Sequence, residues 1–373
     1  PTEDDDDAGD DDTTSDDDDE GDDDDVGEED DAADDDDAAD DDATSDDDDA
    51  TEDDDDVADD DPCTFVVPDD AATIQDGLDL TNPGDTVCVM AGDYMGPILF
   101  PAHNIELISI DGAEFTHLYS SGVVGENVVT FGGTNTNATL FQGFTVHGAI
   151  DTNSLIFAWG GSPTLANLDI LCLLDGQSNF SGYGLGVYQS SGTVLVQNTH
   201  IADCQFGITV FGGSTIEGEN LIVEGNTGYE PFYGTEYGAG VRAGNSSNLT
   251  FTNSVFDGNG LVGLLMLNAN LTLINSIVTN HTQFGVSMEQ SGTVFVSDFN
   301  AYHGNATDFG FYAAYGPSDS TLDPEYTDPT LNDYTLQSSS PAIDSGSPAS
   351  IYDDPDGTRN DKGAYGGPLA WSW

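Results

Sequence analysis

The feature that most constrains the fold of this chain is a repeat of about 22 residues, each copy marked by an asparagine. The marker positions are Asn167, Asn198, Asn220, Asn253 and Asn275, spaced 31, 22, 33 and 22 residues apart, and Asp298 follows as a sixth member. Apolar residues recur at fixed offsets on both sides of the markers. A second column reads Gly-apolar-x-apolar, with Gln189 as the one polar exception, and its members begin at Gly186, Gly207, Gly240, Gly263 and Gly285. A period of this length predicts a solenoid of stacked, similar coils.

Within each repeat the apolar residues alternate with polar ones, which predicts short strands with one face inward. A coil of two or three such strands cannot bury its own inner face, so neighbouring coils stack about 4.8 Å apart and share one core. Asparagine suits the corners because it tolerates left-handed backbone and can hydrogen-bond its counterpart in the next coil. The predicted fold class is therefore all-β, a parallel β-helix. Residues 71–80 are predicted to form a short capping helix with Asp70 as N-cap.

Both ends of the predicted solenoid resemble a known superfamily. The stretch Val67-Pro-Asp-Asp-Ala-Ala-Thr-Ile-Gln, followed by Asn82-Pro-Gly-Asp-Thr-Val, is similar to the start of pectin-lyase-like, right-handed parallel β-helix proteins. The stretches Ser340-Pro-Ala-Ile-Asp-Ser-Gly-Ser-Pro and Asp354-Pro-Asp-Gly-Thr-Arg-Asn-Asp-Lys-Gly resemble the C-terminal segment of exported bacterial β-helix proteins called choice-of-anchor Q. The resemblance implies export and a location outside the cell or on a bacterial surface. It does not imply one activity, because the superfamily contains lyases, hydrolases, epimerases, adhesins and proteins without known activity.

The charge of the chain is concentrated at its start. Residues 1–61 hold 40 of the 73 acidic residues and no Lys, Arg, aromatic, Leu, Ile or Met. Such a segment cannot bury enough apolar surface to offset its chain entropy, so we expect a disordered, extended tether. The alternative is a low-affinity Ca²⁺ reservoir, since carboxylates are hard oxygen ligands. The predicted organisation is then this tether, a β-helix over residues 62–316, and a C-terminal packing segment over residues 317–373.

The composition also excludes two classes of partner. With 3 basic residues and a formal net charge of −70, the chain cannot neutralise the phosphates of a nucleic acid or bind an anionic membrane surface. No run of 18 apolar residues is present, so no membrane-spanning helix is predicted. No basic-then-apolar leader precedes the acidic segment, and we expect any export signal to be absent from this chain.

Candidate catalytic residues are few. Lyases of this fold are expected to need basic side chains, and the predicted β-helix contains only Arg242. The Gly-His-Gly and Arg-x-Lys elements expected of the glycosidases of this fold are absent. Glu224 and Asp257 occupy one column on adjacent coils, which suits a pair of catalytic carboxylates or a Ca²⁺ site; the alternative is two solvated acids. Asp169 and His200 share another column and are interpreted as a surface pair.

Aromatic residues gather in two insertions at the same corner of the repeat, after residues 173 and 226. The candidate ligand-binding residues are Phe180 and Tyr183 in the first insertion, and Tyr229, Phe232, Tyr233 and Tyr237 in or beside the second. The coil between them has no insertion, so the two should flank a notch about 10 Å wide. Aromatic rings facing a notch suit the apolar faces of neutral sugars. The alternative is that these rings pack only on their own loops.

A possible calcium loop lies near the C-terminus. Residues 353–362 contain Asp354, Asp356 and Asp361 in a pattern that partly resembles a Ca²⁺-binding loop, without its closing Glu. Arg359 and Lys362 lie in the same loop, and the alternative is that they neutralise its carboxylates.

Four cysteines and one apolar stripe complete the expectations. The register brings Cys172 close to Cys204 on neighbouring coils, and the first two strands bring Cys63 close to Cys88, so disulfides 63–88 and 172–204 are predicted.

Ile222, Val255 and Ile277 stack at an outward position, where a solenoid should be polar. We expect the C-terminal segment, which carries Leu322, Leu331, Leu336, Ile343 and Trp371, to fold back and cover them.

Taken together, these features predict an exported, non-catalytic surface scaffold that binds a glycan or another surface. One alternative is a carbohydrate-active enzyme acting on a neutral polysaccharide, and another is a purely structural extracellular spacer. No cofactor other than Ca²⁺ is indicated.

Overall fold

A computed structural model describes residues 62–149, 153–172, 182–230, 235–236 and 238–371 of the chain. The chain divides into two units, residues 1–58 and residues 59–373, and all described residues lie in the second unit. The predicted tether therefore lies outside the described residues. In the described part of the chain, no helix is long and apolar enough to cross a membrane.

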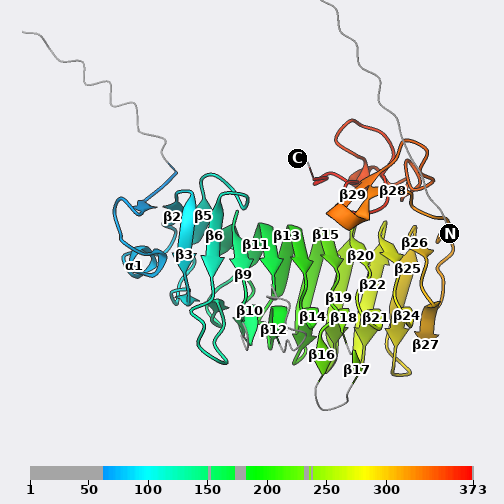
Figure 1. The fold of residues 1–373 in the computed structure, drawn as a ribbon, viewed down its shortest axis with the longest axis horizontal. Coiled ribbons are helices and arrows are strands. Elements are labelled where there is room, and N and C mark those ends of the chain that lie inside the picture. The colour runs from blue at the N-terminus through cyan, green and yellow to red at the C-terminus, as the bar shows by residue number, and fades with distance from the viewer. Residues whose placement is uncertain (1–61, 150–152, 173–181, 231–234, 237, 372–373) are drawn as a thin grey trace, which may run out of the picture. The chain divides into compact units, whose positions relative to one another are not determined.

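A sheet of 16 strands forms one side of the molecule, with every neighbouring pair parallel (Figure 1). Its main path runs through β1 (Phe65–Val67), β2 (Thr86–Val89), β5 (Glu106–Ser109), β8 (Leu140–Gln142), β11 (Thr164–Leu171), β13 (Thr193–Ala202), β15 (Thr215–Glu224), β19 (Ser247–Thr252), β22 (Ala269–Ile274) and β25 (Phe295–Asp298). Beside this path lie β3 (Gly92–Met95), β6 (Thr116–Tyr119), β9 (Thr145–His147), β20 (Val255–Asp257), β23 (Ile277–Thr279) and β26 (Ala301–His303). Each step joins a strand to its equivalent one coil later.

A second parallel sheet, of 9 strands, faces the first across the core. In chain order its strands are β4 (Ile98–Leu99), β7 (Val129–Phe131), β10 (Ser154–Trp159), β12 (Tyr183–Tyr188), β14 (Phe206–Phe211), β18 (Ala239–Ala243), β21 (Val262–Met266), β24 (Phe284–Met288) and β27 (Thr307–Phe311). Two antiparallel pairs join β16 (Tyr229–Glu230) with β17 (Thr235–Glu236), and β28 (Tyr326–Asp328) with β29 (Asp333–Leu336). Short 3₁₀ turns occupy Pro329–Leu331 and Ser350–Tyr352.

The marker asparagines form the corner of the larger sheet, as the repeat predicts. All five have left-handed backbone, with φ between 44° and 55°. This conformation bends β11, β13 and β15 at their midpoints, so one strand contributes to two faces. The sixth member was placed one residue too early: Ile274 pairs with Asp298, and the left-handed corner residue of that coil is Phe299 at φ 58°.

The interior between the two sheets is a continuous apolar core. Its inward columns consist of fully buried side chains such as Leu165, Val196 and Phe251. Gly218 stands in the same column because a Cβ there would lie 2.6 Å from side-chain atoms of Leu221 and Phe251. Parallel coils that share such a core confirm the predicted parallel β-helix.

The capping helix is shorter than the sequence predicts. Helix α1 (Ile74–Asp79) has Thr73 as its N-cap, and the Thr73 side chain accepts a hydrogen bond from the Asp76 N–H. The helix buries Ile74 and Leu78. Asp70 is not the N-cap, because its carboxylate accepts a bond from the Val66 N–H at 2.8 Å and closes the preceding turn.

The C-terminal segment lies along the outside of the larger sheet (Figure 1). It covers the outward stripe of Ile222, Val255 and Ile277, which are 3%, 0% and 0% exposed. The covering side chains are Tyr326, Tyr334, Ala342 and Ala364, with Leu336, Tyr365 and Trp371 partly buried beside them. Leu322 and Leu331, which the sequence proposed for this cover, are 58% and 78% exposed instead.

Both predicted disulfides are present, Cys63–Cys88 and Cys172–Cys204, with Cα atoms 5.5 Å and 4.8 Å apart. We expect peptide mapping under non-reducing conditions to recover these two cross-linked pairs. Free thiols or exchanged pairs would contradict the register of the coils on which the rest of the structure depends.

Candidate functional site

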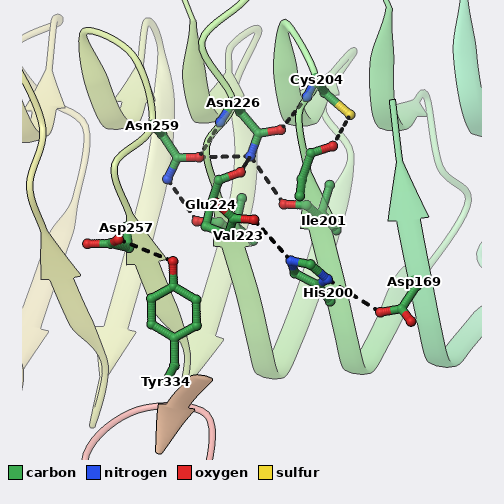
Figure 2. Close-up of polar contacts among 11 residues, drawn as sticks. Asp169, His200, Ile201, Cys204, Val223, Glu224, Asn226, Asp257, Asn259 and Tyr334 are labelled. Atoms are coloured by element: carbon green, nitrogen blue, oxygen red, sulfur yellow. Dashed lines mark hydrogen bonds and ion pairs between the residues drawn. The ribbon is translucent and has the colours of Figure 1, made fainter. Parts of the chain in front are cut away.

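A row of ionisable side chains crosses the larger sheet at the ends of β11, β13, β15 and β20. Register pairs Asp169 with His200, and Glu224 with Asp257, as the sequence predicts. The imidazole of His200 lies between two carboxylates, with Nδ1 3.4 Å from Asp169 and Nε2 3.3 Å from Glu224 (Figure 2). Burial lowers the pKa of His200, but the hydrogen bonds and charges of the two carboxylates outweigh burial and raise this pKa to about 9. His200 is therefore an imidazolium at neutral pH.

Asp257 turns away from this row toward the C-terminal segment. Its carboxylate accepts hydrogen bonds from Thr279 Oγ1 at 2.6 Å, Asn280 Nδ2 at 2.7 Å and Tyr334 O–H at 3.2 Å. Figure 2 shows Tyr334 pointing at Asp257 from the covering segment. Burial raises the pKa of Asp257, and these hydrogen bonds oppose the shift. Glu224 and Asp257 thus hold different structural partners, an arrangement that favours a structural role over a catalytic pair.

A second polar ladder lies inside the neighbouring corner. Asn226 Nδ2 donates to Asn259 Oδ1 at 2.7 Å (Figure 2), and the next two members are His281 and Asn305. Burial lowers the pKa of His281 to about 4, so this ring is neutral at neutral pH. The sequence analysis missed this ladder, although its members recur 33, 22 and 24 residues apart, in step with the coils.

The aspartates of the candidate calcium loop accept hydrogen bonds from residues of the C-terminal segment, inside and outside the loop. Asp354 accepts hydrogen bonds from the N–H groups of Asp361 and Gly367, and Asp361 accepts one from the N–H of Asp344. Burial raises the pKa of Asp361 to about 6, whereas bonds from Thr358 lower the pKa of Asp356. Among the described residues, no group of three or more His, Cys, Asp or Glu side chains is placed to hold a metal ion. Calcium binding stays a prediction.

The basic residues of that loop do not neutralise its acids, contrary to the alternative weighed for them. Arg359 Nε donates to the Gly346 carbonyl at 2.8 Å. Lys362 is 4% exposed and donates to the Asn300 carbonyl and to Ser320 Oγ, both at 3.3 Å. Both cations therefore fasten the C-terminal segment through hydrogen bonds to neutral groups.

Aromatic side chains line the outward face of the second sheet. Trp159, Tyr188 and Phe211 occupy one column on β10, β12 and β14, and Phe157 stands beside Trp159. We call these four residues the aromatic face. Trp159 is 58% exposed and Tyr188 37% exposed, and their ring centroids lie 6.0 Å apart in an edge-to-face arrangement.

The predicted aromatic residues of the insertions are only partly described. Phe180, Phe232, Tyr233 and Tyr237 lie outside the described residues. Tyr229 is placed in β16, and Tyr183 begins β12, where its ring lies 5.8 Å from that of Phe206. The notch between the insertions therefore stays a prediction, but Tyr183 does border the aromatic face. The sequence analysis missed that face because the insertion after residue 173 hides the register between β10 and β12.

Comparison with known proteins agrees with this architecture. A family model described as right-handed β-helix region matches residues 231–338. The crystal structure of pectate lyase Pel9A is similar, with a TM-score of 0.56, 18% sequence identity, and coverage of 78% of this chain and 90% of that chain. A pectin methylesterase from Aspergillus niger aligns with a TM-score of 0.42 and 13% identity, over 70% of this chain and 90% of that chain. No curated protein matches the sequence.

The described structure, the family model and the likeness to pectate lyase Pel9A define the fold class: the protein is a right-handed parallel β-helix. Sequence identities this low show a shared fold and nothing more, so the function must be argued from the side chains of this chain.

Proposed function

We propose that this protein is an exported, non-catalytic β-helix scaffold that binds a glycan on its aromatic face. The observation that carries the proposal is the exposed Trp159–Tyr188 pair on adjacent coils. Exposed aromatic rings held on adjacent coils present apolar surfaces, which suit the apolar faces of sugar rings. The sheet beneath holds these rings at a fixed spacing, so little side-chain order has to be gained on binding.

Two further observations support parts of this proposal. Disulfides persist in oxidising compartments, so the two pairs favour a protein that works outside the cytoplasm. The candidate catalytic carboxylates are engaged by His200 and Tyr334, which favours binding over hydrolysis. A carbohydrate-active enzyme and a purely structural spacer remain the two outcomes against which the proposal is tested.

Replacing Trp159 by Ala is expected to weaken glycan binding about tenfold or more, because the most exposed ring of the face is lost. Retardation in native gels that contain a bound polysaccharide measures the change. Phe115→Ala is the matched control, since Phe115 is 53% exposed and lies in a turn away from the second sheet. Equal retardation of Trp159→Ala and wild type would contradict the placement of the glycan on this face.

A further inference from the structure

The centre of the second sheet has an outward column in which two small residues stand between two large ones. Register aligns Phe157 on β10, Gly186 on β12, Thr209 on β14 and Arg242 on β18. Strands in a sheet lie about 4.8 Å apart, so Phe157 and Arg242 stand about 14 Å from each other with two small residues between them. The result is a hollow of about 210 Å³, the Arg242 hollow, whose walls include Tyr183, Tyr188 and Phe211.

Glycine at position 186 keeps this hollow open. A Cβ there would lie 2.9 Å from the ring of Phe157 and 2.9 Å from Ser154 Oγ, closer than ordinary contact. The same geometry places the Ser154 hydroxyl directly over the floor of the hollow. A volume of this size accommodates one ring-sized group and excludes a large ligand.

Two residues that line the hollow each have a buried polar atom without a protein partner. Ser154 is 1% exposed, and its Oγ atom has no hydrogen bond in the described structure. The Nε atom of Arg242 is likewise buried and without a partner. A buried polar group without a partner is costly, so native structures rarely keep two such groups around one hollow without a ligand or water.

The surroundings of Arg242 leave its charge available. Its guanidinium carbon lies 5.0 Å from the ring centre of Phe206 and 5.5 Å from that of Phe211, so both rings contact the cation. Among the described residues the ion pairs involve only His200 and His303, and none involves Arg242. Arg359 and Lys362 have no ion pair either, but they donate hydrogen bonds to carbonyl and hydroxyl oxygens, whereas the Nε atom of Arg242 has no partner.

We propose that the Arg242 hollow binds a ring-sized organic monoanion, with its carboxylate held by Arg242 and Ser154 and its ring packed between the aromatic walls. Both orphaned groups can donate, and one carboxylate can accept from both. A monoanion is favoured over a phosphate or sulfate because the protein's strong net negative charge repels a second charge. The proposal deepens the proposed function, since it adds an acidic ring to the ligand of the same face, where the sequence suggested neutral sugars.

Calorimetric titration of the full chain tests this inference. The probes are two carboxylates, glucuronate and benzoate, and their neutral counterparts, glucose and benzamide. In about 150 mM NaCl the Debye length is about 8 Å, which screens much of the long-range repulsion. We expect at least one carboxylate to bind about tenfold or more tightly than its neutral counterpart. Equal binding of both members of each pair, or no binding of any probe, would overturn the inference.

Variants locate the interaction. Arg242→Gln should remove the preference for the carboxylate, whereas Gln290→Glu, which changes the net charge equally at an exposed turn, should keep it. Ser154→Ala should weaken carboxylate binding several-fold without loss of stability, because the native hydroxyl has no partner to lose. This second variant keeps the test decisive if Arg242→Gln fails to fold. Unchanged affinity in Ser154→Ala and in a folded Arg242→Gln would place the anion elsewhere.

The outcomes of these experiments also distinguish a failure of this inference from a failure of the proposed function. Binding of glucuronate supports both. Binding of benzoate without glucuronate, and without retention on any polysaccharide, supports the hollow as an anion site and contradicts glycan binding. Retention on polysaccharides with no preference for carboxylates supports glycan binding and overturns the inference.

Discussion

Replacing Ile277 by Asp is expected to lower the free energy of unfolding by roughly 2–4 kcal/mol, the cost of forcing a charge into a buried apolar site. Ile277 is 0% exposed although it points outward from the coil, because the C-terminal segment lies over it. Its neighbours in the column, Val255 and Ala301, are buried by the same segment. Urea unfolding measures the loss.

Ile110→Asp is the matched control, since Ile110 is 54% exposed and the same substitution there should change stability little. The molecular mass of Ile277→Asp should be measured alongside its unfolding. A variant of full stability would mean that the stripe is not covered in solution. An accompanying loss of association would then assign the stripe to an interface between chains.

Stability is expected to fall by up to about 3 kcal/mol as the pH rises from 6 to 10, because His200 loses its proton. The pKa of this imidazole is raised from 6.5 to about 9 in the folded protein. Between these two values the folded chain holds a proton that the unfolded chain has released. The stabilisation is therefore complete below about pH 6.5 and is lost as the pH rises through about 9.

His200→Gln isolates this contribution, because glutamine does not titrate. The variant should be less stable than wild type at pH 6, where Asp169 and Glu224 lose their cation, and its stability should change much less between pH 6 and pH 10. Nuclear magnetic resonance titration of the imidazole gives the pKa directly. The same decline of stability with pH in wild type and variant would show that other groups cause it.

The architecture could be predicted from the sequence because a solenoid repeats its own constraints. Inward columns must be apolar, and corners need residues that accept left-handed backbone. The same pattern therefore recurs in several coils, and each coil indicates the same register. The cover over Ile222, Val255 and Ile277 followed from one physical conflict, namely large aliphatic side chains at positions that face outward. The C-terminal segment was the nearest part of the chain able to resolve it.

Predictions of local register were wrong where a single residue decides the alignment. The Gly column was misaligned in its first member: Tyr183 pairs with Phe206, so Gly184 is the partner of Gly207, whereas Gly186 pairs with Thr209. Two glycines two residues apart give the same pattern, and only backbone pairing distinguishes them. This shift of two residues also hid the alignment of Gly186 with Arg242.

The candidate site was harder to predict because its side chains are brought together across insertions. Arg242 was recognised as the single cation of the β-helix, but the sequence does not show that two phenyl rings contact it. Nor does it show that, among the described residues, no carboxylate forms an ion pair with it. His200 was paired with Asp169 by register, whereas its second partner, Glu224, comes from the following coil. Comparing two columns at a time does not show that one imidazole forms ion pairs with two carboxylates.

Incubating the protein with a panel of neutral and acidic polysaccharides, while measuring both retention and released products, tests the central claim most directly. A glycan-binding scaffold should be retained on at least one polysaccharide and release no reducing ends or unsaturated products from it. Release of products would show an enzyme, and a lack of retention on every polysaccharide would contradict glycan binding.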